Sequence, residues 1–323
     1  MGNPDRTGKG WTLFSFLKKK TARTDLAALG LEAGGVCLAR IDRQGGSLPR
    51  VVACEFQAMQ AGEEARSLAQ LASQHGLKRA RCTTVLAEGE YQLLLTEAPD
   101  VGPDELKQAL RWKIKDLINF HINDAAIDVF ELPGTPAGAR LREMYAVAAR
   151  NEAVQRRVDL LTGAGVGLEI IDIPELAQRN LAALLPEDAA GVALLSLGAT
   201  SGLITITRQG YLYLSRSIEL GTDTLRTAGD PARYFDHIVL EVQRSLDYFE
   251  SHFREAPIRS LVLAPLAEPV DGLLEYLRSN LGVSVGTMDL AQLLDSDIEL
   301  TPALQARCLT TIGAALRQEV TAL

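Results

Sequence analysis

Two parts of the chain repeat one order of predicted elements, and this duplication limits the folds that the sequence can adopt. Three short apolar runs joined by glycine turns lie within residues 27–56, and three more lie within residues 192–218. Such runs are typical of short strands separated by tight turns. A pattern of helix and further strand follows each triplet. The sequence therefore predicts two similar α/β lobes with mixed sheets and a cleft between them.

The rest of the chain divides around this repeat. Residues 1–24 read as a flexible basic tail, residues 25–188 as the first lobe and residues 189–323 as the second lobe. A small insertion subdomain is expected within the first lobe, at about residues 88–140. Apolar spacing and helix-start residues predict helices at 63–75, 103–117, 151–163, 174–186, 232–252, 270–281 and 303–317. Further strands are predicted at 83–87, 91–95, 127–132, 144–149, 168–173 and 260–264.

Charge and cysteine content exclude several classes of protein. The 323 residues carry a net charge of −8, which disfavours a general nucleic-acid-binding role because that role needs a basic face. The four cysteines form no CxxC motif and stand at no ligand spacing from the four histidines. We expect reduced, mostly buried thiols and no metal site.

The amino-terminal tail holds one amphipathic stretch. Residues 11–17 are mostly apolar, with two phenylalanines and a tryptophan, and Lys18, Lys19 and Lys20 follow. This order is the reverse of a signal peptide, and no apolar run approaches the ~20 residues of a membrane span. Two interpretations stay open: a flexible leader, or peripheral membrane association through residues 11–20.

Six segments, in order, resemble motifs of the PilM family. They are residues 110–124, 195–200, 215–221, 241–249, 271–283 and 311–317. The similarity extends over about residues 25–320. Within the family, the chain resembles the MshI proteins of mannose-sensitive (MSHA) type IV pilus systems. The resemblance implies an actin-like fold of ribonuclease H-like repeats, with two lobes, four subdomains and a nucleotide cleft.

The resemblance also implies a place in the cell and a partner. PilM proteins lie on the cytoplasmic face of the inner membrane, where they bind the cytoplasmic tail of a PilN-like membrane protein. A protein similar to them is expected in the cytoplasm at that membrane, with the PilN-like tail and other pilus platform proteins as partners.

The first phosphate turn of the implied nucleotide site is altered. Where the family usually has an aspartate and small hydroxyl residues, this chain has Glu32, Gly34 and Gly35. The glycines could approach a phosphate, but they could equally serve a hairpin turn that needs positive φ. The acid also stands on a longer stem than aspartate.

The other two nucleotide motifs are also altered. Gly198, Ala199 and Thr200 keep the second turn, but Ser196 stands where the family has an aspartate that organises Mg²⁺. The adenosine turn reads Ala-Pro-Leu-Ala at 264–267 instead of being glycine-rich. We therefore expect no cofactor, while ATP with Mg²⁺ bound without turnover stays an alternative.

A basic stretch with one aromatic residue is the candidate partner site. Trp112 and Phe120 would supply apolar anchors for a peptide tail, and Arg111 would pair with an acid or a main-chain carbonyl. The alternative for Trp112 is a place in the core of the small subdomain. Asp247, together with nearby acidic and histidine residues, is interpreted as a solvated helix face.

Three functions are compatible with these residues. The first is a scaffold of the pilus inner-membrane platform without catalysis. The second is an ATP-binding switch that regulates pilus assembly, against which Ser196 and residues 264–267 speak. The third is an enzyme similar to sugar kinases, for which the sequence offers no convincing catalytic aspartate. Fold similarity alone does not decide among them.

Overall fold

The computed structural model describes most of the chain. The described residues are 25–32, 34–43, 48–132, 143–253 and 255–318. The predicted tail of residues 1–24, with its amphipathic stretch at 11–20, lies outside them.

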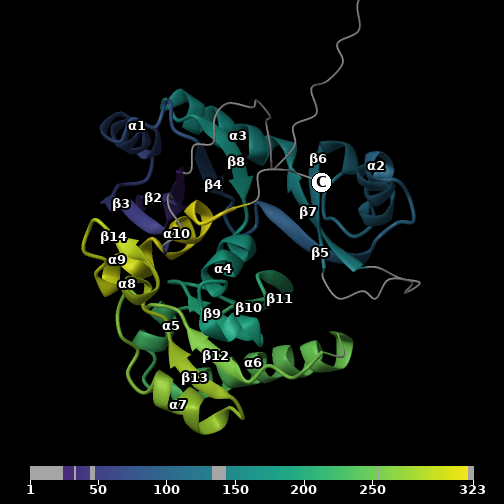
Figure 1. Cartoon of the computed structure of the whole chain (residues 1–323), viewed down its shortest axis with the longest axis vertical. Coiled ribbons are helices and arrows are strands. Elements are labelled where there is room, and N and C mark those ends of the chain that lie inside the picture. Colours follow the sequence, from purple (N-terminus) through teal and green to yellow (C-terminus); the bar gives the residue numbers. More distant parts are fainter. Residues whose placement is uncertain (1–24, 33, 44–47, 133–142, 254, 319–323) are drawn as a thin grey trace, which may run out of the picture.

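The described residues form two large sheets, one small sheet and the helices that cover them (Figure 1). The strands are β1 (Leu26–Glu32), β2 (Gly35–Asp42), β3 (Arg50–Ala58), β4 (Cys82–Val85), β5 (Tyr91–Glu97), β6 (Ala125–Glu131), β7 (Glu143–Arg150), β8 (Leu168–Asp172), β9 (Val192–Leu197), β10 (Gly202–Arg208), β11 (Tyr211–Ile218), β12 (Ser260–Leu263), β13 (Ser284–Thr287) and β14 (Asp295–Ser296). The helices are α1 (Glu64–Gln74), α2 (Pro103–Ile114), α3 (Asn151–Gly163), α4 (Pro174–Ala182), α5 (Thr222–Thr227), α6 (Ala232–Phe253), α7 (Leu273–Asn280), α8 (Leu290–Leu293), α9 (Pro302–Arg307) and α10 (Leu309–Ala315), with single 3₁₀ turns at Ile122–Asp124 and Pro186–Ala189. In the part of the chain described, no helix has both the length and the apolar character that crossing a bilayer requires.

The two large sheets share one strand order. The first runs β14-β3-β2-β1-β4-β8 and the second β11-β10-β9-β12-β13. In each, three antiparallel strands are followed by two strands that pair in parallel, beginning beside the first strand of the triplet. This duplicated order confirms the predicted ribonuclease H-like repeat of an actin-like fold. A further small subdomain is present, whereas the predicted count of four subdomains stays a prediction.

The small subdomain is the sheet β5-β7-β6 with α2 packed on one face. Leu110 and Ile114 of α2 are fully buried against it. The expected bounds of about 88–140 differ from the structure, because β7 at Glu143–Arg150 is the central strand of this sheet. The apolar residues of β7 are buried because both faces of this strand are covered.

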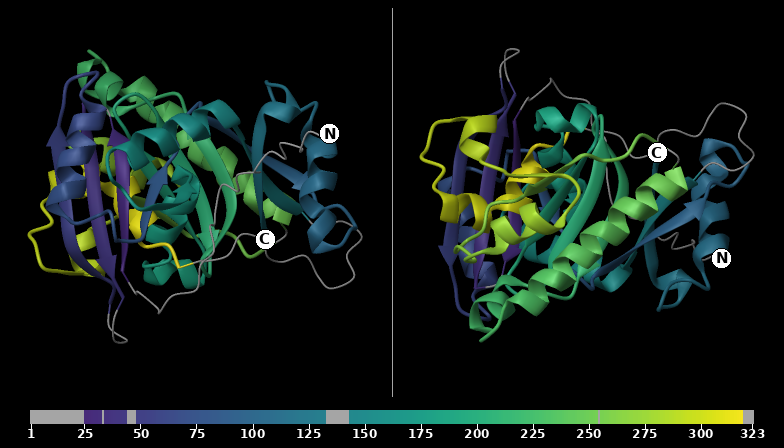
Figure 2. Two further views of the ribbon diagram at one scale, coloured as in Figure 1. Left: turned by 90° about the horizontal axis from the view of Figure 1, so that it is seen from above. Right: turned by 90° about the horizontal axis from the view of Figure 1, so that it is seen from below.

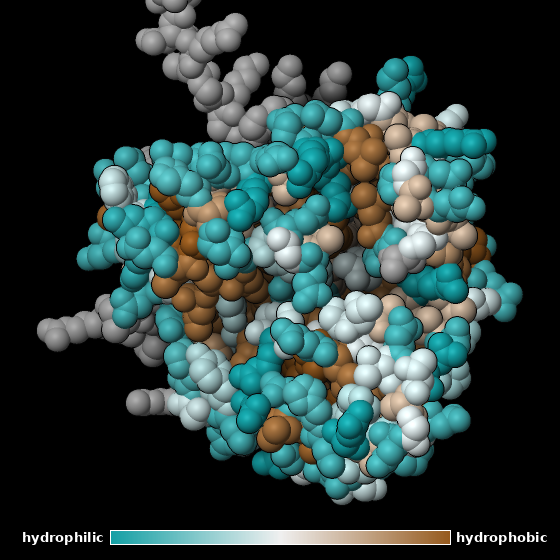
Figure 3. Space-filling model, turned by 180° about the vertical axis from the view of Figure 1, so that it is seen from behind, coloured by the Kyte–Doolittle hydropathy of each residue, from teal (hydrophilic) through white to brown (hydrophobic). Residues whose placement is uncertain are grey.

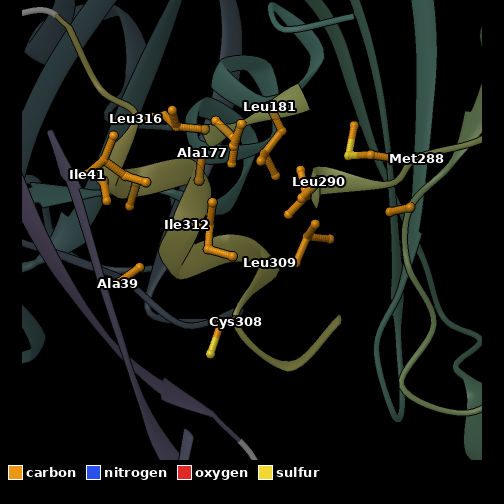
Figure 4. Packing of buried hydrophobic residues seen from close by; sticks show 14 of the residues in the cluster. Ala39, Ile41, Ala177, Leu181, Met288, Leu290, Cys308, Leu309, Ile312 and Leu316 are labelled. Atoms are coloured by element: carbon orange, nitrogen blue, oxygen red, sulfur yellow. The ribbon is translucent and has the colours of Figure 1, made fainter. Parts of the chain in front are cut away.

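Helices α4 and α10 lie together in the core between the two sheets (Figure 4). Ala177 and Leu181 of α4 face Ile312 and Leu309 of α10, while Ile41 of β2 closes the first-lobe side. Gly313 permits the close approach of the helices, since a Cβ there would lie 2.3 Å from the carbonyl oxygen of Ala177.

The carboxy-terminal segment therefore returns to the first sheet. β14 pairs with β3, and α10 packs on β1, β2 and β4. The sequence-based division placed all of residues 189–323 in the second lobe and had one helix at 303–317, but the structure has a break at Cys308 between α9 and α10. The apolar face of α10 explains this return, because the first sheet offers it cover.

Helices complete the outer layers. Figure 2 shows α6 running along one side of the second sheet toward the small subdomain. Phe235, Ile238, Val242 and Phe249 of α6 are buried in the second-lobe core. Leu68 and Leu71 of α1 pack with Leu161 of α3 against the first sheet, and the four cysteines are free and buried, as expected.

Candidate functional site

A cavity of about 240 Å³ lies between the two lobes. Its walls come from the end of β1, the β4–β5 turn, the first residues of α4, the β9–β10 turn and the start of α10. The cavity therefore lies where the resemblance to the PilM family implies a nucleotide cleft. The volume is below the roughly 300–1,000 Å³ usual for ligand pockets.

Of the three residues predicted to bind phosphate in the first turn, only Glu32 lines this cavity, together with Gly30 and Leu31 before it. Gly34 and Gly35 belong to the β1–β2 hairpin and are not among its lining residues. Gly34 has φ of 75°, as the hairpin interpretation expects. Gly35 is required for another reason, since a Cβ there would lie 2.4 Å from the Phe56 ring. The structure thus gives both glycines a structural role.

The second predicted turn is closed by its own main chain. The N–H of Gly198 donates to the carbonyl of Ser201 at 2.8 Å. The carbonyls of Gly198 and Ala199 accept from the first two N–H groups of α5, at 2.8 and 3.0 Å. Gly198 lines the cavity, but Ala199 and Thr200 do not. Gly198 does not have a positive φ, and a Cβ there would lie 3.2 Å from the carbonyl oxygen of Ser201.

Ser196, at the position of the family's aspartate, takes part in a neutral hydrogen-bond network. Its hydroxyl donates to Oε1 of Gln178 at 2.8 Å. Nε2 of Gln178 in turn donates to the carbonyls of Leu194 at 2.7 Å and Leu203 at 3.2 Å. Gln178 is buried, so this network fixes α4 against the second sheet. No anionic group is left at this position to order a metal ion.

The cavity carries carboxyl groups and no basic lining residue among those described. Glu32, Glu88 and Glu175 line it. Burial raises the pKa of Glu32 to about 7, against the opposing effect of Arg157. Burial also raises the pKa of Glu175, whose Oε2 accepts from the Tyr91 hydroxyl at 2.6 Å. A polyphosphate would meet no cationic partner here.

A contact between the lobes crosses the cavity. Oγ of Ser201, from the second lobe, donates to Oε2 of Glu88, from the first lobe, at 2.7 Å. Within the described residues, no group of three or more acidic, histidine or cysteine side chains could hold a metal ion. The turn at 264–267 does not line the cavity, because Ala264 is buried in the core and Leu266 packs on the second-lobe cluster.

We expect Mg-ATP and Mg-ADP to leave the melting temperature unchanged. A ligand at 100 times its Kd would add about 2.7 kcal/mol to the free energy of unfolding. Such a gain would raise the melting temperature by roughly 5 °C or more. A thermal-shift titration to millimolar nucleotide checks this, and a rise of several degrees would show that the altered turns still bind.

Glu32 makes stability depend on pH. Its pKa is about 7 in the fold and near 4.5 when unfolded, so the protonated form is favoured by folding. The contribution of Glu32 to the free energy of unfolding is therefore fully present below pH 4.5 and is lost as the pH rises through 7. Glu32→Gln should therefore be more stable than the wild type at pH 8.5, by up to about 3 kcal/mol, and similar at pH 4.5.

Urea unfolding at the two pH values measures this difference. Glu250→Gln, at an exposed carboxylate on α6, is the control and should show no gain at pH 8.5. An equal gain for both variants would mean that overall charge, and not Glu32, is responsible.

The three residues predicted to bind a partner peptide have different surroundings. The Arg111 guanidinium donates to the carbonyls of Ile122 at 2.6 Å and Ala125 at 3.2 Å, so it stabilises its own subdomain. Phe120 is half-buried beneath the guanidinium of Arg150, 4.6 Å from the ring centroid. Trp112 has 69% of its surface exposed, so its alternative place in the core is wrong.

The polar residues near the end of α6 lie on a solvated face, as interpreted. Asp247 and Glu250 are exposed. His252 contacts Oε2 of Glu143 at 2.9 Å and thereby joins α6 to the small subdomain. Sequence reasoning missed Glu88, in the β4–β5 turn, and Glu175 and Gln178, both on α4, since none of them belongs to a motif.

Residues 97–228 match the family model described as type IV pilus assembly protein PilM. This match begins at the last residue of β5 and ends just after α5. A search of curated proteins finds no relative of significant sequence similarity.

Solved structures share the whole fold. A PilM–PilN type IV pilus biogenesis complex superposes with a TM-score of 0.72 at 20% identity, over 91% of this chain and 98% of that chain. The cytoplasmic domain of EpsL, an inner membrane component of the type II secretion system of Vibrio cholerae, superposes with a TM-score of 0.51 at 11% identity, over 92% and 97%. At these identities the likeness establishes the actin-like fold and nothing finer.

Proposed function

We propose that this chain is a PilM-type protein that serves as a cytoplasmic scaffold of a type IV pilus inner-membrane platform and binds the cytoplasmic tail of a PilN-like membrane protein. The observation that carries the proposal is the likeness to a PilM–PilN complex over 91% of the chain, together with the family match at 97–228. The sequence motifs favour an MSHA-type system, with other platform proteins as further partners.

The scaffold needs no catalysis in this proposal. The neutral Ser196–Gln178 pair and the acidic cavity support a cleft that does not turn over ATP. An ATP-binding switch is the alternative, and no specific contact favours it. A kinase-like enzyme would need a catalytic aspartate in the cavity, where the described lining residues have only glutamates.

Trp112 is proposed as an anchor for the tail. It is the most exposed large apolar side chain described, Leu117 nearby is 55% exposed, and Lys115 Nζ lies 5.5 Å from the Trp112 ring centroid. Exposed tryptophans that become buried on binding commonly dominate interface energies. Arg111 and Phe120 would support this surface from within the subdomain.

Trp112→Ala should weaken tail binding at least about tenfold, because hot-spot truncation costs about 2 kcal/mol or more. Its melting temperature should stay close to that of the wild type, since exposed side chains contribute within about 0.5 kcal/mol. Tyr211→Ala, at another exposed aromatic residue, is the control and should bind normally. Loss of stability with unchanged affinity would remove Trp112 from the interface.

Membrane recruitment tests the function as a whole. Proteoliposomes that hold the full-length PilN-like protein should sediment this chain, and proteoliposomes with the tail deleted should not. Equal sedimentation with both would contradict tail binding. A version of the chain without residues 1–24, tested on anionic liposomes, separates any contribution of residues 11–20.

A further inference from the structure

Three of the four cysteines meet in the core beside the first sheet. Cys37 lies on β2, Cys54 lies on β3, and Cys308 lies at the break between α9 and α10, just before α10 in Figure 4. All three belong to one cluster of buried residues. They are far apart in the chain, so the return of the carboxy-terminal segment to the first sheet is what brings them together.

The pairing of β2 with β3 places two of these cysteines on one face of the sheet. Cys37 stands opposite Phe56, and Cys54 stands opposite Ala39. Residues that oppose each other in a strand pair point to the same side, and so do alternate residues along a strand. Cys37 and Cys54 are therefore diagonal neighbours, and both belong to the core cluster that contains α10.

The third cysteine lies against both strands. The Cys37 thiol donates to the carbonyl of Arg307 at 3.1 Å, and the Cys308 thiol lies in donor position 3.6 Å from the carbonyl oxygen of Glu55. Each contact joins one strand cysteine, or its neighbour, to the segment that holds Cys308. Hydrogen bonds with the Cys37 and Cys54 thiols, together with burial, raise the pKa of Cys308. The Cys308 sulfur is thus a protonated thiol in contact with two others.

The fourth cysteine has different neighbours. Cys82, on β4, is fully buried, and its thiol donates to the carbonyls of Leu77 at 3.5 Å and Ala80 at 3.7 Å. Among the described residues, it is the only cysteine of its own core cluster. Burial raises the pKa of Cys82 to about 12, so it stays an unreactive thiol. It is the internal control for the chemistry of the other three.

The three clustered cysteines differ in their access to solvent. Hydrophilic residues cover much of the surface, as the view from behind shows (Figure 3), whereas the cysteines belong to the apolar interior. Cys37 and Cys308 are 0% exposed, but Cys54 is 9% exposed. A small neutral oxidant such as hydrogen peroxide therefore meets Cys54 first.

We propose that Cys54 and Cys308 form a reversible redox site, in which a hydroperoxide oxidises Cys54 and Cys308 resolves the product as a disulfide. The O–O bond of hydrogen peroxide breaks, the Cys54 sulfur takes one hydroxyl, and the Cys54 proton leaves with the other as water. The Cys308 sulfur then attacks the Cys54 sulfur, so that the S–S bond forms as the S–O bond breaks. The released hydroxyl leaves with the Cys308 proton as a second water.

The electrons of this sequence balance without a further reactant. Two thiols lose two electrons in total, and one peroxide gains them and becomes two waters. A small dithiol such as dithiothreitol reverses the step by thiol–disulfide exchange. In a reducing compartment such a disulfide is transient, as redox-sensing disulfides are.

The disulfide would fasten the carboxy-terminal segment to the first sheet. It would join β3 to the break before α10, the helix that packs with α4 between the two sheets. A cross-link between residues far apart in the chain strongly restricts the unfolded state. We expect the oxidised chain to melt higher than the reduced chain by roughly 5 °C or more.

Thiol mapping of the folded, full-length chain tests the site. The chain is treated with hydrogen peroxide and unfolded in N-ethylmaleimide, and its peptides are identified by mass spectrometry. We expect loss of two of the four free thiols and a cross-link between the Cys54 and Cys308 peptides, both reversed by dithiothreitol. Cys37→Ala and Cys82→Ala should keep this cross-link.

A variant without the resolving thiol tests the order of the two steps. In Cys308→Ala the sulfenic acid should persist on Cys54, where dimedone should label it at least several-fold more than in the wild type. Cys54→Ala should abolish both the label and the cross-link. Mapping of the wild type alone still decides the proposal if either variant fails to fold.

Three results would overturn the proposal. A cross-link between Cys37 and Cys308 in the wild type would remove Cys54 from its assigned role. Oxidation of Cys82 as fast as Cys54 would mean that the chain reacts after unfolding and not through the cluster. Four intact thiols in the folded chain, under conditions that oxidise the urea-unfolded chain, would remove the site altogether. None of these results bears on tail binding, so the proposed function is tested separately.

Discussion

Gly313→Ala is expected to destabilise the protein by about 3 kcal/mol or more, although alanine is the better helix former. A Cβ at position 313 would lie 2.3 Å from the carbonyl oxygen of Ala177 and 2.8 Å from its carbonyl carbon. Both atoms belong to the main chain of α4, so no side-chain rotation relieves the contact. The two helices must separate, and the core that they form with the first sheet must loosen with them.

Gly163→Ala is the matched control for this prediction. Gly163 is also helical, at the end of α3, and a Cβ there would have no neighbour within 4 Å. This variant should be neutral or more stable by less than about 1 kcal/mol. Urea unfolding compares the two. Equal free energies of unfolding for both variants would mean that α4 and α10 do not approach as closely as described.

Arg317→Met should cost about 3–5 kcal/mol, because it leaves a buried carboxylate without its cation. Nη1 of Arg317 lies 2.9 Å from Oδ2 of Asp172, and their side chains are 6% and 0% exposed. The pair joins the segment after α10 to the end of β8, just before α4 begins. Its loss should therefore weaken the same inter-lobe core that Gly313 helps to close.

A double variant separates the ion pair from packing. In the wild type, the Ile173 N–H donates to Oδ1 of Asp172 at 2.9 Å. Asp172→Asn keeps an oxygen acceptor for this N–H and removes the buried charge. Combined with Arg317→Met, it should recover a large part of the lost stability. If the double variant is as unstable as Arg317→Met alone, the cost comes from lost packing of the arginine stem.

The sequence was sufficient for the repeat and for most elements. Glycine turns and apolar runs predict both triplets of strands, because each strand is covered on at least one face. β13 escaped prediction because it has only four residues and contains Gly286. The return of α10 to the first lobe also escaped, since its apolar face fits any core and only the three-dimensional arrangement selects the first sheet.

The candidate site was harder to predict. Loss of the aspartate at Ser196 can be read from a motif, but Gln178, which accepts the hydrogen bond of the Ser196 hydroxyl, lies on another element. Glu88 and Glu175 likewise meet only after folding. Arg111 and Trp112 are adjacent in sequence, yet one binds its own main chain and the other faces solvent, because neighbouring helix residues point in different directions.

A titration of the labelled PilN-like tail with this chain, with and without Mg-ATP, tests the scaffold account most directly. Fluorescence anisotropy gives the affinity in each condition, and a scrambled peptide is the control. We expect saturable binding whose Kd changes by less than about twofold with nucleotide, below the roughly 5–150-fold range of typical allosteric coupling. Absence of binding, or tight binding only when Mg-ATP is present, would contradict the account.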